Sequence, residues 1–397
     1  MADGVRTPNL PAAESAAAFL VNEDTGGGVL VTRALPADAV KAAAGLGNVD
    51  NTADADKPVS AAQADAISAA LSGAISSASQ MQGWRNRLIN PDGRTNQRAA
   101  ATAADDAYAW DRWTVLTQTA AVGISSLSDV ADGVPSLMRM TQSQATAQRM
   151  GYLQVIEGKY CKDMRGANAC LSGKVRASAA LTVRYAILAW TGTEDTVTSD
   201  VVLSWTSTTF APGGFFLASN VSVVQQGSLA LAANTLTNLT ALVGAMPSTL
   251  NNAIVMLWTD AAATQNVTLD CRMQLEAASV ERPFEVRPYG ADLAMCQRYY
   301  QISPALPATW GASTTQPSVV AAFIVPMRVA PTVGLLSGSI NGGSALEVGV
   351  AQRAISAVGT VTANAYGARW DITTAAAGGT YRGCICEAGA FSFSAEL

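Results

Sequence analysis

Histidine is absent from this chain of 397 residues. Histidine-based triads, histidine general bases and nearly all catalytic zinc sites require an imidazole, so these classes of site are excluded. The chain has six cysteines whose spacing matches no zinc ribbon. Cys161 and Cys170 bracket KDMRGANA and leave two alternatives open, a loop disulfide or free thiols. We expect no metal, no cofactor and no enzymatic activity.

Charged residues are also scarce, at 14 % of the chain against 49 % hydrophobic residues. No window approaches the ~18 uninterrupted apolar residues of a membrane span, so we expect no membrane insertion. The opening MADGVRTPNLPAAES lacks the basic region and apolar core of a signal peptide, which predicts a protein made and assembled in the cytosol. The surplus apolar surface is best placed between subunits, because obligate interfaces resemble a domain core cut in half.

The negative charge lies in the first part of the chain. Residues 1–83 hold four Lys/Arg and nine Asp/Glu, a net of −5, while residues 84–397 hold 21 of each and are neutral. An acidic segment followed by a neutral body has none of the basic surface that nucleic acid requires. We therefore expect no nucleic-acid partner.

Residues 45–83 join a turn-rich segment to a helical pattern. GLGNVDNTADADKPVS is rich in the Gly, Asn and Asp residues that form turns, and its carboxylates could otherwise ligate calcium, although the spacing is not that of an EF-hand. From Pro58 to Met81, small apolar residues recur in steps of three and four, as on one stripe of a helix. So narrow a stripe cannot bury itself within one chain. It predicts a helical neck in a homo-oligomer.

Four stretches in order along the chain resemble one protein family. They are GNVDNTADADKPVSAAQ (47–63), RLINPDGRTNQR with AYAWDRW (87–113), MQLEAASVERPFEVRPYGADLAMCQRYY (273–300), and FIVPMRVAPTV (323–333) with a terminal AEL. Together they resemble the tail fibres, or receptor-binding proteins, of tailed bacteriophages. The resemblance implies a homotrimeric, mostly β virion protein that binds the host surface, with a sandwich like that of carbohydrate-binding modules.

The remaining pattern predicts a mainly β protein with several parts. Residues 1–44 suggest a hairpin around GGG and a short helix ending on Gly45; the resemblance makes this element the attachment to other tail or baseplate proteins. Short alternating runs predict a jelly-roll-like antiparallel sandwich over 84–287, including a strand at 198–208, whereas 141–158 has the period of a helix or an extended edge. A linker at 288–301 with a short helix leads to a smaller β domain at 302–397.

Aromatic side chains are the best sequence candidates for receptor contact, because sugar rings stack on them. Trp113, Trp190, Trp205 and Trp258 lie in apolar runs and predict core positions. Four residues lie beside turns of the distal domain and are the glycan-binding or receptor-binding candidates: Trp310, Tyr366, Arg369 and Trp370. Arg298, Tyr299 and Tyr300 of QRYY are expected to pack at the domain junction.

These observations predict a tail fibre of a phage virion, assembled in the host cytoplasm, that recognises a bacterial surface glycan or outer-membrane protein without covalent chemistry. Two alternatives stay open. One is a purely structural virion part, such as a head fibre or a baseplate spacer. The other is a polysaccharide depolymerase, which needs two carboxyl groups about 5.5 Å or about 6.5–9.5 Å apart. Its candidate carboxylates are scattered along the chain: Asp105, Asp106, Asp111, Glu194, Asp195, Asp260 and Asp270.

Overall fold

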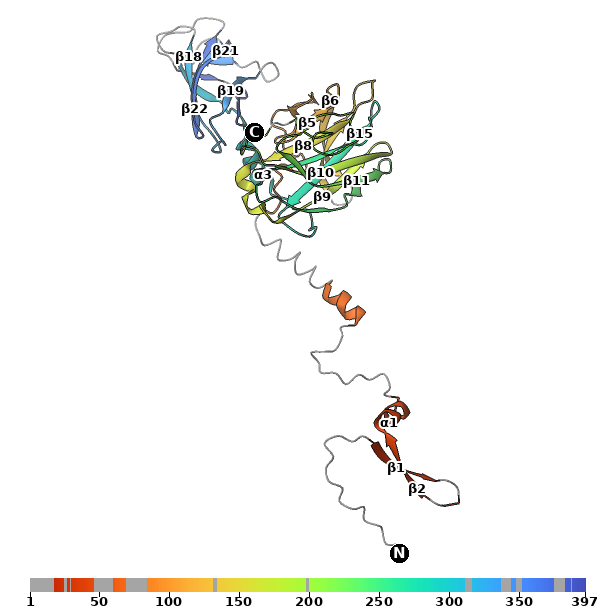
Figure 1. Ribbon diagram of the computed structural model, residues 1–397. Helices are drawn as coiled ribbons and strands as arrows, with labels where there is room; N and C mark the ends of the chain where they lie inside the picture. The colour runs from red at the N-terminus through yellow and green to blue at the C-terminus, as the bar shows by residue number, and fades with distance from the viewer. Residues whose placement is uncertain are drawn as a thin grey trace. The chain divides into compact units, whose positions relative to one another are not determined.

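The computed structural model describes residues 18–24, 27–28, 30–45, 60–68, 84–130, 134–197, 200–310, 316–336, 344–347, 352–374, 383–386 and 388–397. Within these ranges the protein is mainly β (Figure 1), and its named strands pair antiparallel. This confirms the predicted fold class. The chain divides into two compact units, Met1–Ala74 and Ile75–Leu397.

The first unit contains the predicted hairpin and short helix. Strands β1 (Ala18–Asp24) and β2 (Leu30–Pro36) pair antiparallel, and the helix α1 (Ala37–Ala43) follows Pro36 directly. Gly27 and Gly28 in the turn have φ of +84° and +83°, a backbone region that glycine enters without a steric cost. Gly45, at φ +70°, ends α1 in the same left-handed conformation, as the sequence predicts.

The predicted neck is helical over residues 61–68. Its start is fixed by a capping box, in which the backbone N–H of Gln63 donates to Ser60 Oγ at 3.2 Å and the Ser60 N–H donates to Gln63 Oε1 at 3.1 Å. Ile67 on this helix is 58 % exposed in the single chain. The acidic turn segment 46–59 and the remainder of the predicted neck, 69–83, lie outside the described residues.

The second unit begins with a sandwich of two sheets. The six-stranded sheet runs β11 (Val221–Leu231), β10 (Leu181–Trp190), β14 (Asn252–Thr259), β8 (Met150–Ile156), β5 (Thr114–Thr117), β4 (Ala107–Tyr108). The other runs β12 (Thr237–Asn238), β9 (Asn168–Ala177), β15 (Thr268–Glu276), β7 (Val134–Thr141), β6 (Val122–Val130), β3 (Thr102–Ala103), with β13 (Leu242–Ala245) also on β9.

Alternation along the strands builds the core between these sheets. In β15, Leu269, Cys271, Met273 and Leu275 are fully buried in it. The residues between them point to the outer face of the sheet, because successive strand side chains alternate. Trp113 is fully buried in the same core, as predicted.

Two local predictions for the sandwich are wrong. The stretch 141–158 contributes β8, which lies between β14 and β5 rather than at an edge and is buried along its whole length. The described part of 198–208 forms no named strand, and Val201 and Val202 pack there beside Trp258. This loop covers the outer face of β8 and β14. A strand buried on both faces loses its period-2 signal, so its short apolar run resembled a helix.

The cysteines decide the open disulfide question. Cys161 and Cys170 are both free and buried. Cys161, in the turn between the 3-10 helices η2 (Gly158–Tyr160) and η3 (Lys162–Met164), accepts a hydrogen bond at 3.2 Å from the Ala253 N–H. Burial raises the pKa of its thiol to about 12, so it stays protonated and inert.

Helix α3 (Tyr289–Gln297) and strand β16 (Tyr300–Ile302) lead out of the sandwich into the second β domain. Strand β16 pairs with β24 (Phe391–Ser394), which also pairs with β19 (Thr332–Leu335). A closed barrel follows, in the order β17 (Leu306–Trp310), β18 (Pro317–Ala322), β22 (Gly367–Thr374), β21 (Gln352–Ala363), β20 (Ser344–Glu347), β23 (Gly383–Cys386).

Buried ion pairs join the sandwich to the end of the chain. Glu396 accepts from Arg98 at 2.8 Å and from Arg112, and the Arg112 guanidinium lies 3.8 Å from the ring centre of Tyr299. Tyr299 in turn donates its hydroxyl to Glu157 at 2.6 Å, and Arg98 covers the ring of Tyr300 at 3.8 Å. The predicted packing of QRYY at the junction is confirmed.

Glu157 makes this junction sensitive to acid. Burial alone would raise the pKa of its carboxyl, but hydrogen bonds from Arg298, at 2.8 Å and 3.2 Å, and from Tyr299 outweigh burial and lower it. A lowered folded pKa stabilises the fold at neutral pH. That stability is lost as the pH falls from about 4.3, the unfolded value, through the folded pKa.

We therefore expect the melting temperature to fall between about pH 5 and pH 3, and Glu157→Gln to reduce that fall while melting lower at pH 7. Scanning calorimetry of both proteins across this range measures the difference. Parallel pH profiles for wild type and variant would show that Glu157 is not the group responsible.

Candidate functional site

The four aromatic and arginine candidates of the distal domain have different environments. Trp370 is 1 % exposed and packs edge-on against Phe391, with ring centres 4.9 Å apart. The prediction that Trp370 contacts a receptor is therefore wrong, because its strand alternates and places this residue inside the barrel. Tyr366 is 72 % exposed and Arg369 is exposed, so both stay predictions. Trp310 ends β17 opposite Pro317, and its side chain lies outside the described residues.

Most of the carboxylates proposed for a depolymerase are bound by their own chain. Asp111 accepts from Gln97 at 2.5 Å, Asp195 from Asn252 at 2.7 Å, and Asp260 pairs with Arg184. Asp105 accepts the Thr117 N–H at 2.7 Å. Asp270 is fully buried between two arginines. These side chains hold turns and strands in place.

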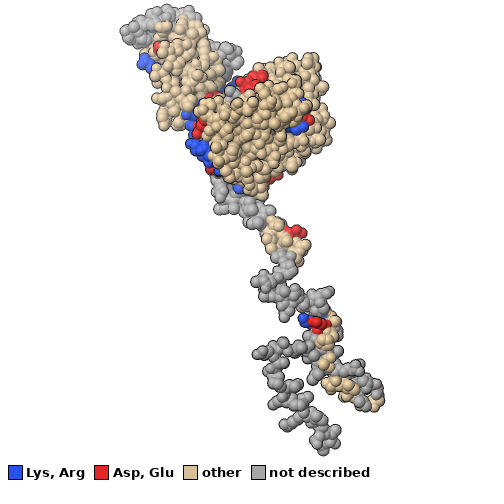
Figure 2. Space-filling view, viewed as in Figure 1, with Lys and Arg blue, Asp and Glu red and all other residues tan. Residues whose placement is uncertain are grey.

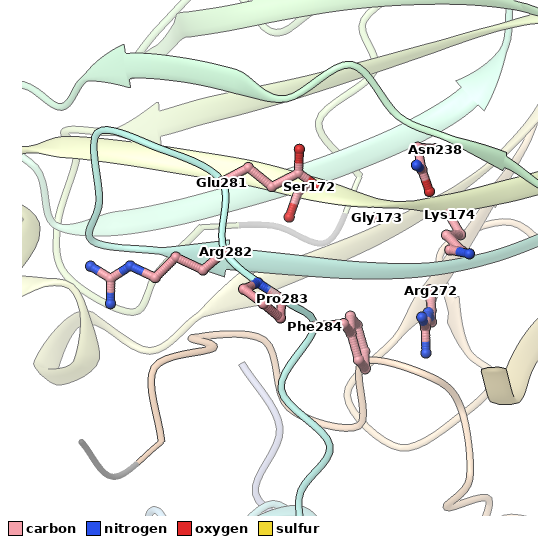
Figure 3. Close-up of a pocket in the computed structure, with 9 residues that line it drawn as sticks. All are labelled: Ser172, Gly173, Lys174, Asn238, Arg272, Glu281, Arg282, Pro283 and Phe284. Carbon is pink, nitrogen blue, oxygen red and sulfur yellow. The ribbon is translucent and has the colours of Figure 1, made fainter. Parts of the chain in front are cut away.

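A cleft of about 340 Å³ lies on the outer face of the sandwich, over β9, β12 and β15. Figure 3 shows the side chains that line it. They come from three strands of one sheet and from the segment after β15, and are Ser172, Gly173, Lys174, Asn238, Arg272, Glu281, Arg282, Pro283 and Phe284. Sequence reasoning did not identify this site.

The wall of the cleft is fixed by hydrogen bonds to Gln274. Its side-chain amide donates to the carbonyl of Arg282 at 3.3 Å and to that of Pro283 at 3.4 Å, and its Oε1 accepts the Glu285 N–H at 2.7 Å. Gln274 itself is fully buried. The segment carrying Glu281 and Phe284 is therefore tied to the sheet, so the cleft is preformed.

Arg272 occupies the floor of the cleft. It is 7 % exposed, and its Nε is buried without a hydrogen-bond partner within the described part of the chain. Its guanidinium lies 4.2 Å from the ring centre of Phe284, a cation–π contact that fixes both side chains. Burial lowers the pKa of Arg272, partly offset by the field of Asp92. Asp92 is itself salt-bridged to Arg94 at 2.9 Å.

The two ends of the cleft differ in charge. Lys174 and Arg272 lie at one end beside Asn238 and Phe284, whereas Glu281 lies near Ser172 toward the other end. Figure 3 also shows the guanidinium of Arg282 directed away from the group around Arg272. Burial raises the pKa of the Glu281 carboxyl. The arrangement offers amide, hydroxyl and charged groups beside one aromatic ring, the set that recognises a polyhydroxylated ligand.

Charged side chains are sparse on the face of the sandwich that Figure 2 displays. Figure 2 shows the visible face of the sandwich as mostly uncharged, with Lys, Arg, Asp and Glu gathered chiefly toward its margins. No set of three or more metal-ligating side chains occurs among the residues that the structure describes. Within those residues, too, every helix falls short of the length and apolarity of a bilayer span.

No family model and no curated protein matches this sequence. Among solved structures, a putative sugar binding protein from Bacteroides thetaiotaomicron is similar at 11 % identity, with a TM-score of 0.31 over 49 % of this chain and 100 % of that one. The enzymatically active domain of tailspike protein 4 of bacteriophage CBA120 is 12 % identical, with a TM-score of 0.29 over 48 % of this chain and 21 % of that one. A CBM22-1–GH10 module pair of Clostridium thermocellum xylanase 10B is 13 % identical, with a TM-score of 0.28 over 45 % and 28 %. None of these likenesses assigns a ligand to this chain.

Proposed function

We propose that this chain is the receptor-binding tail fibre of a bacteriophage and that the sandwich cleft binds a glycan of the bacterial surface. The observation that carries the glycan proposal is the cleft itself. It combines a preformed wall, one aromatic ring and several polar side chains on a rigid sheet. Such sites orient sugars through a few placed polar groups beside an apolar surface.

The virion role is supported by the four sequence stretches that resemble tail fibres. Three copies of the chain would pair their necks, which agrees with the exposure of every described neck residue from 60 to 68 in the single chain. The N-terminal hairpin would dock on other tail or baseplate proteins, and the barrel would form the distal tip. Three weak sites on one fibre gain avidity, because the second and third contacts are intramolecular.

Glycan binding in the cleft and glycan binding at the distal tip predict different results for two variants. We expect Phe284→Ala to weaken binding to bacterial polysaccharide about tenfold, because the variant removes the ring and frees Arg272 to move. If the cleft alone binds the glycan, Tyr366→Ala, which removes an exposed ring of the barrel, should bind as the wild type does. A polysaccharide array and competition with phage adsorption measure both effects on the purified full chain.

The opposite result would move the site. If Tyr366→Ala lost binding and Phe284→Ala kept it, the receptor contact would lie on the barrel and not in the cleft. If the wild type bound no polysaccharide and blocked no adsorption, the chain would be a structural part of the virion.

A further inference from the structure

Strands β9 and β15 carry a ladder of paired side chains on the outer face of the sandwich. Asp270 lies opposite Arg176 on β9 and opposite Arg139 on β7. Both arginines form ion pairs with its carboxylate, each at 2.7 Å. At this position, each arginine of the ladder has a carboxylate partner within the sheet.

Two residues further along, the same ladder is unmatched. Lys174 and Arg272 are direct cross-strand partners, so two cations lie opposite each other. Neither has a carboxylate within salt-bridge distance among the described residues, whereas Asp270, the next outward residue of β15, has two arginines. Like charges at directly opposite positions destabilise a sheet.

Burial makes this pair more costly. A charge that is removed from water without a partner destabilises the fold, and Arg272 is nine-tenths buried with an unbonded Nε. The ring of Phe284 offsets only part of this cost, because a cation–π contact does not satisfy N–H donors. An anion between Lys174 and Arg272 would satisfy both side chains at once.

We propose that the cleft binds an acidic sugar, whose anionic group lies between Lys174 and Arg272 and whose ring lies beside Phe284. This inference rests on the proposed glycan binding and names its ligand class. Glu281 at the other end of the cleft repels the anion and so fixes the direction in which the sugar enters. Asn238 and Ser172 are placed to bond hydroxyl groups.

The anionic group can be a carboxylate, as in a uronic acid, or a phosphate ester on a sugar. Both match the planar donor fork of an arginine. Matched probes separate these sources: an oligosaccharide of glucuronic acid, its carboxyl-reduced neutral counterpart with the same linkages, glucose 6-phosphate, and inorganic phosphate alone.

The test is isothermal titration of the full chain with each probe. We expect at least one acidic sugar to bind about tenfold or more tightly than the neutral counterpart, since charge-assisted hydrogen bonds form only with the acidic probe. Arg272→Gln and Lys174→Gln should each remove most of that preference. Lys162→Gln, which removes a surface charge whose side chain is 58 % exposed, should retain it and serves as the matched control.

Folding is checked independently. Arg272→Gln removes an unpaired buried charge, so it should melt at or above the wild-type temperature while it loses acidic ligand. If Arg272→Gln did not fold, Lys174→Gln would supply the test, because Lys174 is only half-buried.

Equal binding of acidic and neutral sugars, unchanged by either variant, would overturn the acidic ligand and leave glycan binding in place. If inorganic phosphate bound and none of the sugar probes did, both proposals would be overturned. If both variants still preferred the acidic sugars to the neutral one, the anionic group of the sugar would bind outside this cleft.

Discussion

Replacing Glu396 by glutamine should lower the free energy of unfolding by about 3–5 kcal/mol, because it leaves the buried Arg112 without its carboxylate partner. Glu396 is 6 % exposed in its side chain and pairs with Arg98 and Arg112. Burial alone would lower the pKa of Arg112, yet Glu396 raises it above its usual value. In the variant that effect of Glu396 is gone, but the usual pKa of a guanidinium lies so far above neutral pH that Arg112 stays charged, and it loses its strongest partner.

Calorimetry measures the temperature of the lowest unfolding transition in the wild type and in the variant. Denaturant titration of both proteins gives the free energy of unfolding. Glu194→Gln is the control, because Glu194 is 37 % exposed and lies 3.8 Å from the exposed Lys162. A surface pair of that kind contributes about 1 kcal/mol or less. Equal losses in the two variants would mean that the Glu396 contact does not hold the junction.

Truncating Trp258 to alanine should cost about 3–5 kcal/mol through the cavity that remains. Trp258 is fully buried, stacks on Phe215 with ring centres 5.1 Å apart, and meets Phe216 edge-on at 5.7 Å. These rings attach the loop between β10 and β11 to the outer face of the sheet. We also expect Trp258→Ala to make that loop susceptible to proteolytic cleavage.

Trp258→Phe provides the matched control. Phenylalanine keeps a ring in the same place and removes an indole N–H that has no partner among the described residues. We expect a much smaller loss of stability and no new proteolytic cleavage. If alanine and phenylalanine behaved alike, aromatic packing would not be what holds the loop.

The sequence motifs and the cleft occupy different places. Arg98, Arg112, Tyr299 and Glu396 come from three of the stretches that carry the tail-fibre resemblance, and they converge at the junction. Their charges serve the contact between the sandwich and the end of the chain. The cleft uses part of one of those stretches, residues 273–300, which contains Phe284 and begins directly after Arg272. Its chemistry also depends on Lys174, which lies on another strand, outside these stretches.

A signal for the cleft was present in the sequence but could not be interpreted alone. The run LDCRMQLE alternates apolar residues with Asp270, Arg272, Gln274 and Glu276, which indicates a polar outer face. Alternation does not say which charge on that face finds a partner. That depends on register with β9, which pairs Asp270 with Arg176 and leaves Arg272 opposite Lys174.

The sequence by itself determined the mainly β class, the hairpin at the start, the short helix after Pro288 and the core position of Trp113, because each follows from local pattern or turn chemistry. It did not determine that β8 is an interior strand, that Trp370 points inward, or that a cleft forms above Arg272. Those features were decided by tertiary structure, since burial on a second face, strand register and unpaired charge arise only when distant segments meet.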